Sequence, residues 1–346
     1  MFTKNTQITY PLLLIASTTK RSFEALGAMI NKSGDTIKRW LSPKEVSLKI
    51  VAKIAQYMFK NNRELTLSID DSLLHKIHSA LMVGTGKFYD TKLGKRVNAF
   101  RLIVGALTNG KNIIPINFGY FFSKELLSEE DVVKTKLDFI KEFYTNAKRL
   151  FFDKKIRIAA DGLFATIDFL QWAIDSGIDA IVRMHSNRKV EYNGQEIRIS
   201  QIKDLQPKNH QKARTIKVIW HGLPLFITAE KRVSKKGKES IVFLAATYKA
   251  KPSKYVKDYK KRWPIEKFFR TAKQHLGIKE CFSRDLDIQA CHVAAVFVAY
   301  AFAQYEMKKR NLDNPEQAIK ALKRKKPKNL IDYFMRSNQI FLDIYA

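Results

Sequence analysis

The sequence predicts an α/β protein with a mixed sheet flanked by helices, interrupted by a β-rich insertion, and with helical regions at both ends. Two patterns lead to this prediction. Apolar and polar residues alternate from residue 65, which is typical of half-buried strands, whereas the first 60 residues and the chain after Pro252 have helical spacing. Between 184 and 247, short β-like runs are separated by glycines and many lysines. We therefore expect a helical region 1–62, a core 63–183 and 248–285, an insertion 184–247 and a helical region 286–346.

The first region is expected to contain two short helices around a turn. Apolar residues recur at helical spacing over 22–30, the segment 31–34 (Asn-Lys-Ser-Gly) is a turn signal, and a second helical pattern covers 35–41. This second segment carries Lys38 and Arg39. Such a pair resembles a helix-turn-helix, so these two side chains are candidate DNA contacts. An ordinary helical pair with a solvated basic face is an equally open alternative.

The core is predicted from seven elements in succession. They are strands 65–71, 100–107 and 113–122, helix 128–147, strand 156–161, helix 166–176 and strand 180–183. The first three strands are expected to form a hairpin meander, and the turn Thr108-Asn-Gly-Lys111 joins two of them. This order of elements is the one expected of a ribonuclease-H-like core.

The insertion and the C-terminal region differ in their predicted elements. Strands are expected within the insertion at 215–220, 225–229 and 241–246. After Pro252 the chain is expected to be helical to its end. The apolar segment 290–303 falls short of the roughly 20 residues that a membrane span needs. It is therefore predicted to be a buried core helix, and no membrane partner is expected.

The charge balance indicates what kind of partner the protein binds. The chain has 63 Lys and Arg against 33 Asp and Glu, a net charge of +30, which indicates a polyanionic partner. Its 2 cysteines cannot form a disulfide framework, which fits a reducing cytoplasm. No glycine-rich phosphate-binding motif is present, so no nucleotide cofactor is expected. His75 and His78 flank the first acidic residues, but no second close ligand pair completes a zinc site.

Three acidic positions are candidates for metal chemistry. Asp70 and Asp71 close the first predicted strand, Asp161 closes the fourth, and Glu266 lies on a helix after the insertion. Acids at the ends of adjacent strands can converge, and hard divalent cations such as Mg²⁺ or Mn²⁺ relieve their mutual repulsion. Two such ions can flank a phosphate during its transfer. Aspartates at strand ends are also common turn formers, so that interpretation stays open for each of them.

A run of basic and aromatic residues carries the most specific pattern in the chain. The spacing Y-x2-R-x3-E-x6-K is formed by Tyr259, Arg262, Glu266 and Lys273. On one continuous helix these four positions fall within a narrow arc, and an acid among basic residues suits a metal ligand with phosphate contacts around it. In an alternative, Pro264 starts the helix and leaves Tyr259 and Arg262 on a preceding element. A salt-bridged, solvated helix face is a further alternative.

This pattern resembles the signature of the bacterial insertion-sequence transposases of the IS-four type, members of the DDE superfamily with a ribonuclease-H-like core. All four positions and spacings agree with the signature. Ile69-Asp70-Asp71-Ser72 resembles the family's first acidic block, and Ala160-Asp161-Gly162 resembles its second. The family also has a β-rich insertion between its second aspartate and its glutamate, as expected here for 184–247. The resemblance covers roughly residues 65–280.

The resemblance implies a catalytic and metal-binding triad of Asp71, Asp161 and Glu266. In the family, the acid immediately before the hydroxyl residue is the ligand, which selects Asp71 over Asp70. The usual hydroxyl residue is threonine, and Ser72 stands here. The implied cofactors are two Mg²⁺ or Mn²⁺ ions.

The resemblance also implies DNA contacts around the glutamate. Tyr259, Arg262 and Lys273 would contact phosphates near the transposon end and help to hold a terminal or flipped nucleotide. Trp263 directly follows Arg262. A buried aromatic is the favoured interpretation of Trp263, and stacking on a base is the alternative.

The implied function is that of a transposase that binds the terminal inverted repeats of an insertion sequence. Water would cleave the phosphodiester at the element's end, and the freed 3′-hydroxyl would attack the opposite strand or target DNA. The implied partner is double-stranded DNA, with a homodimer assembled on it in the bacterial cytoplasm, at the nucleoid. Two alternatives remain, namely a ribonuclease-H-like DNA nuclease that cuts without joining and a catalytically inactive DNA-binding relative.

Overall fold

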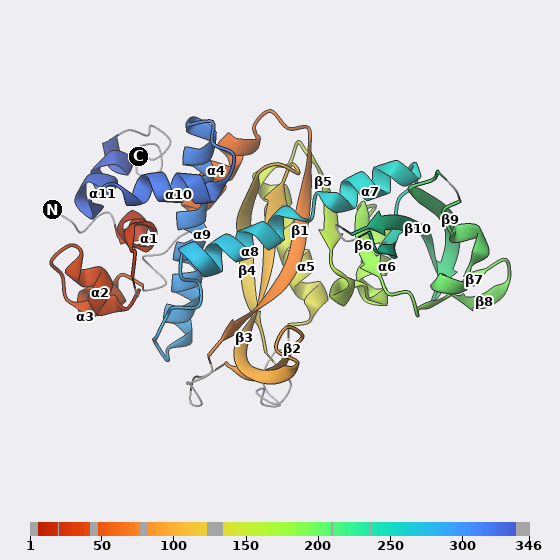
Figure 1. Ribbon diagram of the computed structural model, residues 1–346, viewed down its shortest axis with the longest axis horizontal. Coiled ribbons are helices and arrows are strands. Elements are labelled where there is room, and N and C mark those ends of the chain that lie inside the picture. The colour runs from red at the N-terminus through yellow and green to blue at the C-terminus, as the bar shows by residue number, and fades with distance from the viewer. Residues whose placement is uncertain are drawn as a thin grey trace.

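The structure is a computed structural model that describes residues 6–19, 21–41, 48–76, 82, 84–122, 134–208, 210–234 and 237–336. Its sheet occupies the centre of the molecule, the insertion extends the sheet to one side, and the helices of both chain ends gather on the other side (Figure 1). This arrangement confirms the predicted fold class, a mixed sheet flanked by helices with a β-rich insertion and helical ends.

Five core strands run in the spatial order β4-β3-β1-β5-β6. They are β1 (Glu64–His75), β3 (Lys95–Thr108), β4 (Ile113–Phe121), β5 (Lys155–Ala160) and β6 (Ala180–Met184). β1 pairs antiparallel with β3 and parallel with β5, and β5 pairs parallel with β6. The predicted meander of three strands and the two strands that follow it are therefore confirmed.

The insertion continues the core sheet. Its strands are β7 (Lys189–Tyr192), β8 (Gln195–Arg198), β9 (Ala213–Trp220), β10 (Leu223–Val233) and β11 (Glu239–Ala246), with the short 3-10 turns η3 (Ile199–Gln201) and η4 (Lys203–Leu205) between β8 and β9. β11 pairs antiparallel with β6, where Phe243 lies opposite Met184. Across the described residues, eleven strands thus form one sheet. The three predicted strands of the insertion correspond to β9, β10 and β11.

Three short strands are absent from the sequence prediction. β2 (Gly86–Asp90) pairs with residues 95–99, so β3 begins earlier than predicted. The exposed side chains Lys87 and Tyr89 leave β2 little apolar pattern. β7 and β8 are four residues long each and form a hairpin. Its turn, Asn193-Gly194, has φ angles of 52° and 77°, so this Asn-Gly pair was the available hairpin signal.

Helices cover both faces of the core sheet. α5 (Lys136–Leu150) places Phe143 against Gly105 of β3, whereas α7 (Pro252–Lys260) places Tyr255 in one buried cluster with Ala159 of β5. Figure 1 shows α7 and α8 (Pro264–His275) crossing in front of the sheet and α5 behind it. After β5, the chain passes through the turn η2 (Gly162–Phe164) and α6 (Ile167–Asp175) into β6.

The start of α5 is set by its cap. The predicted start at Ser128–Asp131 lies outside the described residues, and in the structure α5 begins at Lys136. The hydroxyl of Thr135 accepts the N–H of Asp138 at 3.2 Å, and the carboxylate of Asp138 accepts the N–H of Thr135 at 2.8 Å. This capping box satisfies two amides that the first helical turn leaves unpaired.

The described helices of the two chain ends are α1 (Thr6–Ala16), α2 (Phe23–Ala28), α3 (Gly34–Arg39), α4 (Lys49–Phe59), α9 (Leu286–Lys309), α10 (Pro315–Lys323) and α11 (Pro327–Arg336). α1, α4, α10 and α11 pack against α9, and α2 packs against α3. α2 and α3 are the two predicted N-terminal helices. Among the described helices, α9 alone is long and apolar enough to span a membrane, but 78% of its most apolar window is buried inside the protein. It is therefore a core helix, as predicted for 290–303.

Replacing Gly105 with alanine should lower the free energy of unfolding by about 1–3 kcal/mol. A Cβ at this position would lie 2.6 Å from Cδ2 of Phe143, so α5 would have to move away from β3. Thermal unfolding of Gly105→Ala, beside Lys87→Ala at an exposed position of β2, measures the effect. An unchanged unfolding midpoint for Gly105→Ala would contradict this packing.

Candidate active site

Two of the candidate acids lie side by side on neighbouring parallel strands. β1 and β5 pair in a register that sets Ile69 beside Ala160. The next residues, Asp70 and Asp161, therefore lie at the same level and on the same face of the sheet. Asp161 follows the last residue of β5, and its Oδ1 accepts the N–H of Leu163 at 2.8 Å. Strand pairing thus joins two acids that are far apart in the sequence.

Asp70 and Asp71 point to opposite faces of the sheet, because successive strand residues alternate. Asp70 faces the turn between α7 and α8, where its Oδ2 accepts a hydrogen bond from Arg262 at 2.8 Å. Asp71 faces the other side, where its Oδ2 lies 2.9 Å from Nε of Arg101 on β3. Burial, together with the negative charge of Asp161, raises the pKa of Asp70 to about 7, and Arg262 opposes this rise. Burial and Asp161 also raise the pKa of Asp71, while Arg101 opposes this rise.

The signature segment is divided between two helices. α7 ends at Lys260, and α8 begins at Pro264. The prediction of one continuous helical arc is therefore wrong, and the alternative in which Pro264 starts a new helix is confirmed. Proline cannot continue a helix, because it lacks an amide hydrogen and its ring clashes with the preceding turn, but it fits the first helical position. Tyr259 consequently lies on α7, Arg262 in the connecting turn, and Glu266 in the first turn of α8.

Arg262 connects the acid of β1 to the acid of α8. Its Nη1 donates to Oδ2 of Asp70 at 2.8 Å, and its Nη2 donates to Oε1 of Glu266 at 2.5 Å. Its guanidinium carbon lies 5.6 Å from the centre of the Tyr259 ring. Arg262 is 6% exposed and has little contact with water, so these two carboxylates provide most of the stabilisation of its positive charge. The site therefore contains a buried cation between acids from two different elements.

The family of the chain follows from residues 132–302, which match the family model of the transposase DDE domain. This range runs from the segment before α5 into α9 and contains Asp161 and Glu266. The chain belongs to the DDE transposases. Transposases of this family act on DNA and use divalent metal ions to cleave it. No curated protein matches the chain.

The acids of this transposase fit a hard divalent cation by donor type. Asp70, Asp161 and Glu266 supply carboxylate oxygens, which Mg²⁺ and Mn²⁺ prefer over thiols and imidazoles. Within the part of the chain that the structure describes, no three carboxyl, imidazole or thiol groups form a cluster that could hold an ion as they stand. The guanidinium of Arg262 lies between two of these carboxylates and contacts both of them.

Lys273 lies farther along α8 than Glu266. Its ammonium is 5.9 Å from the centre of the Phe269 ring. Burial, together with the positive charges of Lys279 and Lys92, lowers the pKa of Lys273 to about 8. Several positive charges therefore surround this position, and a phosphate placed there would be attracted by all of them.

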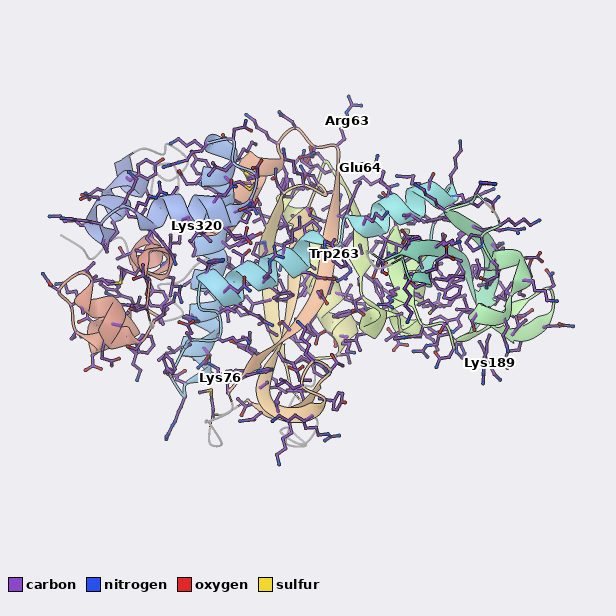
Figure 2. All side chains as sticks on the ribbon, in the orientation of Figure 1. Arg63, Glu64, Lys76, Lys189, Trp263 and Lys320 are labelled. Carbon is purple, nitrogen blue, oxygen red and sulfur yellow. The ribbon has the colours of Figure 1, made fainter. Side chains whose placement is uncertain are left out.

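Other predicted residues lie apart from the acids. Lys38 and Arg39 are exposed on α3, among the terminal helices at the far left of Figure 1, so the structure does not bring them to the carboxylates. Trp263 is 54% exposed at the start of α8, where Figure 2 labels it in front of the sheet. The prediction of a buried aromatic is therefore wrong. α8 buries Ile265 and Phe268 instead, and Trp263 precedes that apolar side.

Two basic residues beside the acids were missed by the sequence analysis. Arg101 reaches Asp71 from β3. Lys136, at the first position of α5, donates its Nζ to the carbonyl of Leu163 at 3.0 Å, in the turn that follows Asp161. No local spacing links these residues to the acids, because only strand pairing and the packing of α5 bring them together.

The histidines near the first acidic block have other partners. Nε2 of His75, at the end of β1, lies 2.7 Å from Oδ2 of Asp90, at the end of β2. His78 lies outside the described residues. At the end of α8, the carbonyl of His275 accepts a hydrogen bond from Arg21 at 2.7 Å.

Replacing Arg262 with alanine should lower the free energy of unfolding by about 3 kcal/mol, because the buried carboxyl group of Asp70 would lose the cation that stabilises its charged form. Asp70→Asn in the same background should recover part of this loss, because a neutral amide does not need a cation beside it. Chemical denaturation of the single and double variants measures the coupling. Arg270→Ala, a change at an exposed position of α8, is the control. Equal stability of Arg262→Ala and the wild type would contradict the buried bridge.

Proposed function

We propose that this DDE transposase serves an insertion sequence of the IS-four type, binds its terminal inverted repeats, cleaves the DNA at its ends and transfers the freed strands. The observation that supports this most directly is the contact of the signature arginine, Arg262, with both Asp70 and Glu266. Asp161 lies beside Asp70 on the next strand. A solvated charged face would not bury its arginine between acids from a strand and a helix.

We assign the catalytic triad to Asp161, Glu266 and one of the neighbours Asp70 and Asp71. The acidic block of the sequence selects Asp71. The contacts favour Asp70, because it lies on the face of Asp161 and shares Arg262 with Glu266. Separate substitutions of the two aspartates distinguish these assignments.

In the proposed reaction, water attacks the phosphorus at the element's end, the bond to the 3′ oxygen breaks, and that oxygen leaves as a hydroxyl. The same hydroxyl then attacks a second phosphodiester, so no covalent bond to the protein forms. Two Mg²⁺ or Mn²⁺ ions held by the triad would stabilise the attacking and leaving oxygens. Arg262 and Lys273 bind the non-bridging phosphate oxygens, and Tyr259, 7% exposed, shares this contact and keeps the guanidinium in place.

In this proposal, the remaining regions supply recognition and assembly. Residues 1–62 bind the terminal repeat through Lys38 and Arg39, which are exposed on α3, a helix capped by Ser33. Residues 286–346 help to pair two protomers on double-stranded DNA. Residues 63–183 and 248–285 form the catalytic core, and residues 184–247 extend its contact with the DNA. The homodimer acts in the bacterial cytoplasm, at the nucleoid, without a nucleotide cofactor.

Asp161→Asn and Glu266→Gln should each abolish cleavage of a DNA duplex that ends in the element's own terminal repeat. DNA binding should persist, because these substitutions remove a metal-binding charge but keep the side-chain shape. Cleavage is measured with Mg²⁺ or Mn²⁺, and a chelator should stop it. Asp70→Asn and Asp71→Asn are assayed in parallel, and the contacts predict the larger loss for Asp70→Asn. Asp168→Asn, at an exposed position of α6, is the matched control.

The products of this assay also separate the candidate functions. Cleavage followed by joining supports a transposase, cleavage alone supports a nuclease, and binding alone supports an inactive DNA-binding relative. A variant without any of the acids that still nicks DNA would rule out the site.

Lys273→Ala should weaken binding to terminal-repeat DNA and reduce the slope of log affinity against log salt by about 1. The wild-type ammonium has a pKa of about 8, so it is charged below that pH and loses its phosphate contact as the pH rises through it. Lys273→Arg stays charged throughout and should not show this loss. Fluorescence anisotropy below and above this pKa measures both effects. An unchanged slope for Lys273→Ala would show that Lys273 contacts no phosphate.

A further inference from the structure

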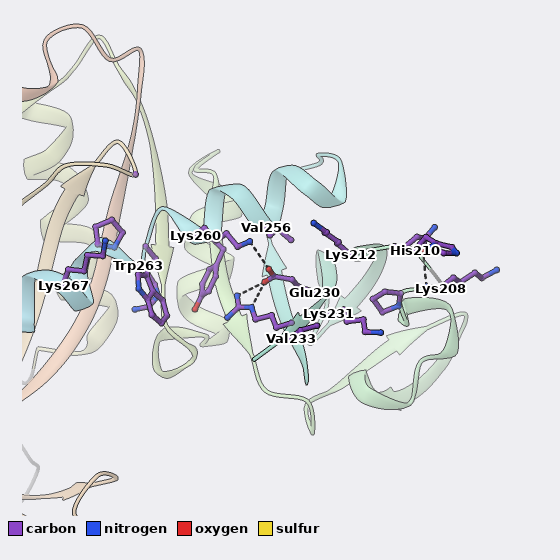
Figure 3. Close-up of a pocket in the computed structure, with 17 residues that line it drawn as sticks. Lys208, His210, Lys212, Glu230, Lys231, Val233, Val256, Lys260, Trp263 and Lys267 are labelled. Carbon is purple, nitrogen blue, oxygen red and sulfur yellow. Dashed lines mark hydrogen bonds and ion pairs between the residues drawn. The ribbon is translucent and has the colours of Figure 1, made fainter. Parts of the chain in front are cut away.

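α8 has a different neighbour at each of its ends. Its start, at Pro264, lines a basic groove of about 1180 Å³ between the α7–α8 junction and the insertion, which Figure 3 shows in close-up. Its end, at His275, is not part of the groove wall and contacts Arg21, in the link between α1 and α2. The helix that carries Glu266 and Lys273 is therefore joined directly to the N-terminal region.

Arg21 is buried at this joint, where it is 6% exposed. Its Nη2 donates to the carbonyl of His275 at 2.7 Å, and its Nε donates to the carbonyl of Leu14 at 3.3 Å. Its Nη1 donates to both carboxylate oxygens of Glu280, at 3.2 and 3.0 Å. Each guanidinium nitrogen therefore has a partner, and the partners come from α1, from α8 and from the segment after α8. A planar group with donors in fixed directions is suited to hold these segments at one angle.

Two of these partners are carbonyls at the C-terminal ends of helices. His275 is the last residue of α8, and Leu14 lies in the last turn of α1. The last four carbonyls of a helix have no partner within that helix, and this end carries the negative part of the helix dipole. An arginine placed there donates to the carbonyls and neutralises the dipole. Arg21 therefore caps α1 and α8 at the same time.

The turn after α8 is shaped to receive the arginine. Gly277 has a φ of 69°, and a Cβ at this position would lie 2.5 Å from Cδ of Arg21. The carbonyl of the same glycine lies 2.9 Å from Nε2 of His292 on α9, and Nδ1 of this buried histidine lies 2.8 Å from the hydroxyl of Tyr10 on α1. A second polar bridge thus connects α1 to the same turn, so the backbone around the joint is held from two sides.

The joint continues directly into the helix pair α2–α3. Ser22 follows Arg21 in the chain and caps α2, where its hydroxyl accepts the N–H of Ala25 at 3.2 Å. α2 packs against α3, which carries the exposed residues Lys38 and Arg39. No loop therefore separates Arg21 from the helix pair, and the side chain lies between the candidate recognition helices and α8.

We propose that Arg21 is a positioning residue that fixes the orientation of the helix pair α2–α3 relative to α8, and thereby selects the phosphodiester that the acids cleave. A terminal repeat bound by α3 reaches the acids at a distance that the joint determines. Successive phosphates of a strand are about 3.4 Å apart along the duplex, so a small rotation at the joint presents a neighbouring phosphate. Arg21 itself contacts none of the candidate triad residues. The inference rests on the proposed function for the binding of DNA by α3.

Arg21→Ala should leave the affinity for terminal-repeat duplex nearly unchanged, because the side chain is buried. The rate of cleavage at the wild-type phosphodiester should fall about 10- to 100-fold, since a displacement of about 1 Å is enough for such a loss. The remaining products should end at several neighbouring phosphodiesters. Single-turnover cleavage of an end-labelled duplex, resolved to single nucleotides below the unfolding midpoint, measures both effects.

Two further variants test the geometry of the joint. Gly277→Ala keeps the arginine, but the added Cβ would displace its side chain, so the same spread of product ends is expected. Arg21→Lys keeps the positive charge but lacks the planar group with donors in fixed directions, so it should not restore a single cleavage position.

Two controls separate positioning from the loss of charge or stability. Arg149→Ala removes an exposed arginine of α5, away from the joint. Gly105→Ala destabilises the packing of α5 on β3 and leaves the joint intact. Both controls should cleave the wild-type phosphodiester, even where the second lowers the amount of folded protein.

Spin labels test the joint without DNA. Lys32→Cys, between α2 and α3, and Arg270→Cys, on α8, place nitroxides at exposed positions on the two sides of Arg21. Cys281 and Cys291 are buried and should react slowly with the label. Double electron–electron resonance should give one narrow distance distribution, which Arg21→Ala should broaden.

Each contrary result would overturn the positioning role. A lower cleavage rate of Arg21→Ala at one unchanged phosphodiester would make Arg21 a stabilising residue only. A wild-type rate and position in both Arg21→Ala and Gly277→Ala, or an unchanged distance distribution, would remove the role altogether.

The distance measurement also separates this inference from the proposed function. Absence of cleavage by the wild type would reject the proposed function, and a distance distribution broadened by Arg21→Ala would still support the joint. Cleavage by the wild type with the same distances in Arg21→Ala would reject the inference alone.

Discussion

A guanidinium held between two carboxylates is the interaction on which the rest of this structure depends. Asp70 is buried next to Asp161, and a nearby cation stabilises the charged form of Asp70 there. Arg262 supplies that cation and ties β1 to the first turn of α8 through Glu266. Both halves of this bridge also have the chemistry of a substrate contact, because carboxylates bind divalent cations and guanidinium binds phosphate. The carboxylates and the guanidinium that stabilise the protein without DNA are therefore the same groups that its reaction would use.

The fold creates this bridge through two backbone constraints. The parallel register of β1 and β5 sets Asp70 beside Asp161, and Pro264 ends the preceding helical stretch so that Arg262 lies in a turn. The pairing of β11 with β6 then carries the sheet onward into the insertion. As a result, the basic groove and the acids share the wall formed by the α7–α8 junction.

Much of the fold could be predicted from the sequence because its long strands and helices have clear periods. The order of the core elements, the three longest insertion strands and the buried α9 all follow from such periods. β2, β7 and β8 could not be recognised in this way, because each is short and most of its residues are polar or exposed, whereas the equally short β6 is mostly apolar. The positions of the acids were visible, but the side of β1 on which each aspartate lies was not. That choice depends on the register with β5, which is a long-range property.

The surroundings of the acids were the least predictable part. Helical spacing alone predicts one helix for the four signature residues, Tyr259, Arg262, Glu266 and Lys273. Only the hydrogen bond to Asp70 shows why the side chain of Arg262 is buried. Trp263 looked like a core residue from its aromatic ring, yet it lines the basic groove, where its side chain is exposed. Arg101 and Lys136 lie near the acids through tertiary contacts that leave no trace in local sequence.

The central claim is that the carboxylates around Arg262 are the ones that bind the metal ions of this transposase. Anomalous scattering from Mn²⁺ in crystals of the protein with terminal-repeat DNA tests it most directly. The account predicts Mn²⁺ bonded to Asp161, Glu266 and Asp70, with Arg262 moved from Glu266 to a DNA phosphate. Manganese bonded to other residues, with Arg262 still joined to Asp70 and Glu266, would contradict it.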